Sequence, residues 1–167
     1  MNKYGKTLMI YAEDDATKQL ADSFFDFLVD YEFNRKWVRV KMYRGWSSAV
    51  DAAIKDDSLK NHDKRKGVIL IDLDKSNTRI SDIKKKIAEE SCEDKIFVVG
   101  WKGNIEQFKA DLGYSGIRFQ KFGERLAEDY LKPDCLENTD NIWQNYRFDD
   151  IKKDYGTLRE LLNIIKN

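Results

Sequence analysis

Short apolar runs rich in strand-forming residues alternate along the chain with longer segments whose apolar residues recur at helical spacing. The run at residues 67–71 contains no polar side chain, which is typical of a central parallel strand covered on both faces. The run at residues 38–42 alternates with basic residues instead, as expected of a strand with one buried face. Together with the runs at residues 7–11 and 96–99, they predict four strands.

Amphipathic helices are predicted between and after these runs, because apolar residues recur there three and four positions apart. A chain that alternates strands with helices predicts an α/β fold of three layers, with a mostly parallel sheet of four to five strands and helices on both faces. A polar loop is expected at residues 56–66. The predicted helices cover about residues 16–30, 47–54, 78–87, 105–112, 122–131 and 157–165.

The length of 167 residues fits one domain, and neither a repeat nor a linker divides it. We expect residues 132–167 to form a helical C-terminal extension packed on this α/β domain. No apolar run approaches the ~20 residues of a membrane span, and the first residues lack the apolar stretch of a signal peptide. Cys92 and Cys135 lie far apart and are expected to be free thiols. These features predict a cytoplasmic protein that does not contact a membrane.

The charge balance argues against tight, independent binding of nucleic acid. The chain has 30 basic and 30 acidic residues, whereas proteins that bind nucleic acid by themselves usually show a basic excess. Small basic clusters at residues 64–66 and 84–86 are expected to be solvated surface. We therefore expect any affinity for nucleic acid to depend on a larger protein partner.

Acidic residues follow directly on two of the apolar runs. Glu13 comes after the first run, and Asp72 and Asp74 end the third. Ligands bind at the carboxyl ends of parallel strands, so we expect the three carboxylates to lie within about 6–7 Å of one another. An oxygen-only ligand set suits Mg²⁺ or Mn²⁺, and such an ion can orient a phosphate. The same positions also suit helix caps and turn residues, which are common at strand ends in α/β folds.

Three further side chains are candidates for contacts with a phosphate or a base. Lys75 and Arg79 follow Asp74 closely, where a cation can meet a phosphate. Trp46 lies beside Gly45 at the expected carboxyl edge of the sheet, where an indole can stack on a base. Solvated surface is the alternative for the two cations, and core or lid packing is the alternative for the tryptophan.

The arrangement of the acids resembles the TOPRIM domain of topoisomerases, primases and related nucleases. The resemblance covers roughly residues 6–101, and the stretches at 9–13 and 68–74 match its strand-Glu and strand-Asp-x-Asp motifs. It implies a magnesium-dependent phosphodiester chemistry on nucleic acid. Glu13 would be the general acid or base in that chemistry, and Asp72 with Asp74 would bind the metal.

The second half of the chain, around residues 97–100, 123–129 and Trp143, resembles small bacterial proteins of unassigned function. That resemblance implies a family without implying an activity.

The acids also resemble those of the receiver domain of response regulators. In that interpretation Asp14 and Asp15 bind Mg²⁺, Asp72 accepts a phosphoryl group, and Lys121 stabilises the product. Such domains have Ser or Thr after the fourth strand, where this chain has Gly100 followed by a tryptophan. A receiver-like signalling or interaction module is therefore one alternative, and a catalytically inactive adaptor is another.

Overall fold

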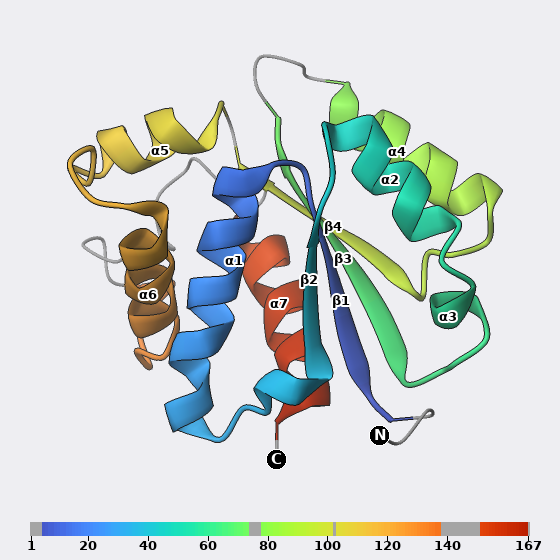
Figure 1. The fold of residues 1–167 in the computed structure, drawn as a ribbon, viewed down its shortest axis with the longest axis horizontal. Helices are drawn as coiled ribbons and strands as arrows, with labels where there is room; N and C mark the ends of the chain where they lie inside the picture. The colour runs from blue at the N-terminus through green and yellow to red at the C-terminus, as the bar shows by residue number, and fades with distance from the viewer. Residues whose placement is uncertain (1–4, 74–77, 102, 138–150, 167) are drawn as a thin grey trace.

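The computed structural model describes residues 5–73, 78–101, 103–137 and 151–166, with side chains from residue 156 onward in the last range. Within these ranges four parallel strands form one sheet in the order β2-β1-β3-β4, flanked by seven α-helices (Figure 1). The strands are β1 (Thr7–Ala12), β2 (Val38–Met42), β3 (Arg65–Asp72) and β4 (Ile96–Trp101). The helices are α1 (Asp15–Leu28), α2 (Trp46–Ile54), α3 (Asp57–Lys60), α4 (Arg79–Glu89), α5 (Ile105–Asp111), α6 (Phe119–Tyr130) and α7 (Ile151–Ile165).

The predicted three-layer α/β architecture is confirmed. Helices α1, α5, α6 and α7 lie on one face of the sheet, and α2, α3 and α4 lie on the other (Figure 1). Alternate residues of β1 serve the two layers, with Ile10 in the core beneath α1 and Tyr11 in the core beneath α2. Strand β3 pairs with β1 on one side and β4 on the other, and its Ile69 and Ile71 are completely buried. Its apolar composition follows from this central position.

The sheet changes winding direction between β1 and β3. From β1 the chain crosses through α1 to β2 on one side, and from β2 it crosses back over β1 through α2 to reach β3. In a doubly wound sheet this point leaves a crevice at the carboxyl ends of the two strands, where ligands bind. The strand order therefore identifies one place in the fold as the expected ligand site.

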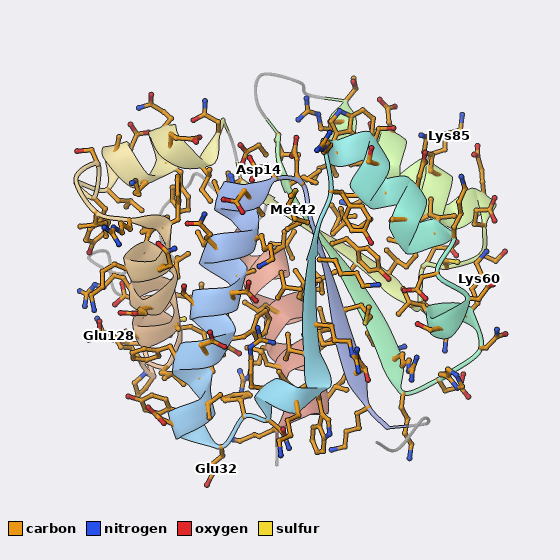
Figure 2. All side chains as sticks on the ribbon, in the orientation of Figure 1. Asp14, Glu32, Met42, Lys60, Lys85 and Glu128 are labelled. Atoms are coloured by element: carbon orange, nitrogen blue, oxygen red, sulfur yellow. The ribbon has the colours of Figure 1, made fainter. Side chains whose placement is uncertain are left out.

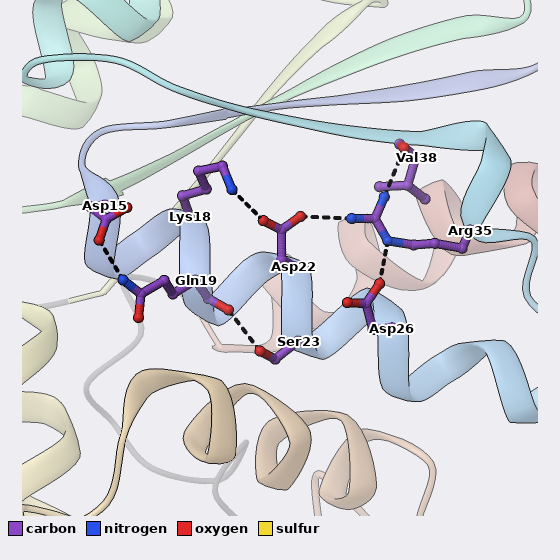
Figure 3. A network of polar contacts seen from close by, with 8 residues as sticks. All are labelled: Asp15, Lys18, Gln19, Asp22, Ser23, Asp26, Arg35 and Val38. Atoms are coloured by element: carbon purple, nitrogen blue, oxygen red, sulfur yellow. Dashed lines mark hydrogen bonds and ion pairs between the residues drawn. The ribbon is translucent and has the colours of Figure 1, made fainter.

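Strand β2 lies at the edge of the sheet and is fastened to α1 by one arginine. The guanidinium of Arg35 donates to Asp26 at 2.6 Å and to Asp22 at 2.7 Å, both on α1 (Figure 3). It also donates to the carbonyl oxygen of Val38 at 2.9 Å, and Lys18 pairs with Asp22 at 2.6 Å. The charge of Arg35 is thus fully used in holding the start of β2 against α1.

Helices α1 and α6 cross at backbone contact. A Cβ atom added to Gly123 of α6 would lie 2.4 Å from the carbonyl oxygen of Leu20 on α1, a distance that no side chain permits. The apolar residues Phe24 of α1 and Phe122 of α6 are buried in the core on this side of the sheet.

Several boundaries differ from the sequence prediction. The predicted polar loop at residues 56–66 is wrong, because it contains the one-turn helix α3 and the first two residues of β3. Helix α6 begins at Phe119, three residues before its predicted start, and α1 ends at Leu28. The inward positions predicted for the last helix are confirmed, since Leu161 and Leu162 are buried. No helix among the described residues has both the length and the apolar character needed to cross a membrane.

Candidate functional site

Glu13 and Asp72 meet at the carboxyl edge of the sheet. Glu13 directly follows β1 and Asp72 ends β3, and these strands are hydrogen-bonded neighbours at the point where the winding changes. One carboxylate oxygen of Glu13, Oε2, accepts a hydrogen bond from the backbone N–H of Asp72 at 2.9 Å. The backbone N–H of Glu13 donates to the carbonyl oxygen of Leu70 at 3.2 Å, which continues the pairing of β1 and β3 past the end of β1. The predicted proximity of these two acids is thus present in the fold.

The carboxylate of Asp72 is buried, with 8% of the residue exposed. Its Oδ1 accepts a hydrogen bond from the indole N–H of Trp101, and its Oδ2 accepts one from the backbone N–H of Ile105 at 3.3 Å. Burial raises the pKa of Asp72 to about 7, against the lowering effect of these two hydrogen bonds. The negative charges of Glu13 and Asp14 raise the pKa further, so near neutral pH this carboxyl group is divided between its acid and its charged form.

Among the described residues, no cation forms an ion pair with the Asp72 carboxylate. The nearby Arg79 donates to the backbone carbonyl oxygen of Asp72 and leaves the carboxylate uncompensated. Asp14 caps α1, where its Oδ1 accepts a hydrogen bond from the backbone N–H of Thr17 at 2.8 Å. Its role as a helix cap was one of the alternatives open from sequence, and its charge still acts on Asp72.

The metal set expected from the sequence is only partly described. Asp74 and Lys75 lie outside the described residues, and within the described ranges no three His, Cys, Asp or Glu side chains are grouped closely enough to hold a metal ion. The donors that Glu13 and Asp72 present are carboxylate oxygens, the chemistry that Mg²⁺ and Mn²⁺ prefer. These two residues therefore fit a hard divalent ion in kind, and Asp74 stays a predicted third ligand.

The fold brings the two described candidates for phosphate and base contacts together. Arg79, at the start of α4, lies over the ring of Trp46, at the start of α2, with 5.5 Å from the guanidinium carbon to the ring centroid. The ammonium of Lys86 lies 5.9 Å from the same centroid. The loop before α2 contacts the acidic site directly, because the backbone N–H of Gly45 donates to the carbonyl oxygen of Glu13 at 3.0 Å. An aromatic ring and two cations thus lie beside the carboxylates.

The residues of the receiver-like interpretation are dispersed. Asp15 is in the first turn of α1 and accepts a hydrogen bond from the side chain of Gln19. Lys121 lies in the first turn of α6, where it pairs with Glu124 at 2.6 Å and leaves 71% of its side chain exposed. In the part of the chain that the structure describes, no fifth strand precedes this lysine.

Trp101 is the residue of this site that the sequence analysis did not recognise. It is the last residue of β4 and lies in register with Asp72 of β3, so its indole reaches the carboxylate from the neighbouring strand. The signal for it was present, because the rule that placed Glu13 and Asp72 at the carboxyl edge applies to the end of every parallel strand. The sequence analysis considered this position only as a departure from the receiver pattern.

Comparison of the chain with protein-family models, with curated proteins and with solved structures found no match.

Proposed function

We propose that the carboxyl edge between β1 and β3 is a metal-dependent site for phosphodiester chemistry on nucleic acid, of the TOPRIM-like kind. The observation that supports it best is the pairing of Glu13 with Asp72 at the winding switch, with Asp14 close enough to act on Asp72 electrostatically. Acids gathered in this way repel one another unless a cation compensates them. Among the described side chains none does so for Asp72, which favours a cation from solution.

Each residue has a role in this proposal. Glu13 acts as the general acid or base, held by its hydrogen bond to the Asp72 backbone. Asp72 and Asp74 hold Mg²⁺ or Mn²⁺, which when bound supplies positive charge to the oxygens of the phosphodiester. Arg79 and Trp46 lie next to the carboxylates and are suited to a phosphate and a base. Because a ligand carboxylate must be charged, binding of the ion should release a proton from Asp72 near neutral pH.

Calorimetric titration with Mn²⁺ tests the metal half of the proposal. The wild-type protein should bind the ion, and the Asp72→Asn, Asp74→Asn double variant should bind it weakly or not at all. The matched control is Asp15→Asn, which removes one acid from the first turn of α1 without touching Glu13 or Asp72. Titrations that do not distinguish the double variant from the wild type would reduce these acids to caps and turns.

Nicking of plasmid and single-stranded substrates with Mn²⁺ tests the catalytic half. We expect weak nicking that is lost in Glu13→Gln and in Asp74→Asn and is retained in Asp15→Asn.

The receiver-like alternative shares the strand order β2-β1-β3-β4, which is found in flavodoxin-like doubly wound sheets. It requires the opposite result in a different assay. Incubation with a small phosphodonor and Mg²⁺ would then add a phosphoryl group to Asp72, detected by intact mass, and the adduct would depend on Lys121. If neither assay gives a signal, the catalytically inactive adaptor becomes the better proposal.

A further inference from the structure

One segment of this charge-balanced chain contains no acid. Residues 33–50 include five basic side chains and neither Asp nor Glu, although the chain as a whole has 30 of each sign. The segment comprises the edge strand β2, the turn before it and the start of α2. The charge that the whole chain lacks is therefore present locally, on one edge of the sheet.

Four of these five cations face solvent, and we call them the basic strip. The fifth, Arg35, is excluded because its guanidinium is already held by two aspartates of α1 (Figure 3). Along the described chain, Lys36, Lys41 and Arg44 form no ion pair with a carboxylate. The basic strip consists of Lys36, Arg39, Lys41 and Arg44, all exposed.

The basic strip leads to the acidic site. Because β2 runs parallel to β1, its carboxyl end arrives at the same edge of the sheet as Glu13, and Met42 marks this end in Figure 2. The backbone N–H of Tyr43 donates to the carbonyl oxygen of Ala12 at 2.9 Å, and that of Gly45 donates to the carbonyl oxygen of Glu13 at 3.0 Å. Arg44 lies between these two anchored residues, directly beside the carboxylates.

We propose that the basic strip binds the backbone of single-stranded nucleic acid and guides it to Glu13 and Asp72, where Trp46 stacks on an unpaired base. The inference rests on the proposed function, since it names the form of the substrate for that site. Grooves that bind single strands combine backbone cations with an aromatic stacking surface, and here the strip ends within two residues of an indole.

The geometry of one strand favours a single phosphodiester backbone. Arg39 and Lys41 are two residues apart on β2, so their side chains leave the same face of the strand, about 6.6 Å apart along it. That spacing is of the order of the phosphate repeat in an extended single strand. A line of cations along one narrow edge can follow one backbone, whereas a duplex presents two.

Fluorescence anisotropy of a labelled oligothymidine, measured in EDTA, tests the strip without any metal chemistry. The strip variant is Arg39→Gln, Lys41→Gln, and the matched control is Lys84→Gln, Lys85→Gln on α4, away from β2 (Figure 2). We expect the strip variant to bind about tenfold more weakly, with a salt dependence reduced by about 1.4 at ~0.7 per phosphate contact. The control variant should bind like the wild type. Trp46→Leu should weaken single-strand binding about fivefold and leave duplex binding unchanged.

Three results would overturn the inference: no binding by the wild type at low salt, equal losses in the strip and control variants, or competition by polyglutamate as strong as that by the oligonucleotide. The last result would assign the strip to an acidic protein partner. Failure of the proposed function is a separate result, because it concerns nicking with Mn²⁺. Strip-dependent binding without nicking would leave the strip in place, and nicking with unchanged binding in the strip variant would remove it.

Discussion

Two buried aspartates of this molecule have opposite electrostatic surroundings. Asp129, near the end of α6, is completely buried and is compensated by two cations, with Lys132 Nζ at 2.5 Å and an Arg125 nitrogen at 3.9 Å. Asp72, at the end of β3, is held by two N–H groups, and the charges that act on it most are those of Glu13 and Asp14. Burial is common to both acids, and compensation separates them.

The difference indicates which acid is structural and which one is prepared for a ligand. A buried carboxylate with cations close by has its charge balanced within the fold. A buried carboxylate beside other acids keeps an unfavourable energy that a proton or a metal ion removes. The comparison therefore directs attention to Asp72, and the following predictions test each side of it.

The largest effect is expected where α6 touches α1, since this contact holds the helix that carries Asp129. Gly123→Ala should lower the free energy of unfolding by about 3 kcal/mol or more, because the added methyl group collides with the α1 backbone. Urea denaturation measures the loss. Gly156→Ala in α7 is the matched control: its added Cβ meets nothing within 4 Å, so it should gain about 0.5–1 kcal/mol from helix propensity. Equal effects would contradict the close contact.

Asp72→Asn should stabilise the protein, and the gain should depend on pH. The folded pKa of Asp72 is raised to about 7, so between about pH 4 and pH 7 the unfolded chain releases this proton while the folded chain retains it. The stability of the wild type falls over that window relative to the uncharged variant. The advantage of Asp72→Asn should grow by about 2 kcal/mol from about pH 5 to about pH 8 in urea denaturation without divalent metal. An advantage that stays constant with pH would show that the charge of Asp72 is compensated after all.

Asp129→Asn should have the opposite sign. Removal of this charge takes the partner from two cations that are partly exposed and can be rehydrated, so we expect a loss of about 1–2 kcal/mol. Glu128→Gln is the control, because it removes an acid paired with Arg125 on the exposed side of the same helix and should cost less than about 1 kcal/mol. If Asp129→Asn were neutral, the contrast between the two buried acids would lose its structural half.

The smallest effect is expected for Lys121→Ala. Its pair with Glu124 lies at the surface of α6, so the free energy of unfolding should change by less than about 0.5 kcal/mol. Lys132→Ala should cost more, since the partner it leaves is the buried Asp129. The two single variants are compared in the same denaturant series. A larger loss for Lys121→Ala would assign that lysine a role beyond its exposed pair.

Much of the fold could be predicted because its signals are local. The unbroken apolar composition of residues 67–71 indicated a central strand, and the spacing of Leu158, Leu161 and Leu162 indicated the inward face of the last helix. Helix α3 was missed because four residues are too few to show a helical period. The start of β3 was missed because its first two residues, Arg65 and Lys66, are polar and only partly buried.

The sequence by itself determined that Glu13 and Asp72 lie at the carboxyl edge, because each directly follows an apolar strand and parallel strands end together. Only the tertiary structure decided that β1 and β3 are neighbours, that the indole of Trp101 reaches Asp72, and that the basic edge of β2 ends beside Glu13. The physical reason is the range of the interactions. Periodicity and strand ends are properties of consecutive residues, whereas strand order, pKa and charge compensation depend on residues that only folding brings together.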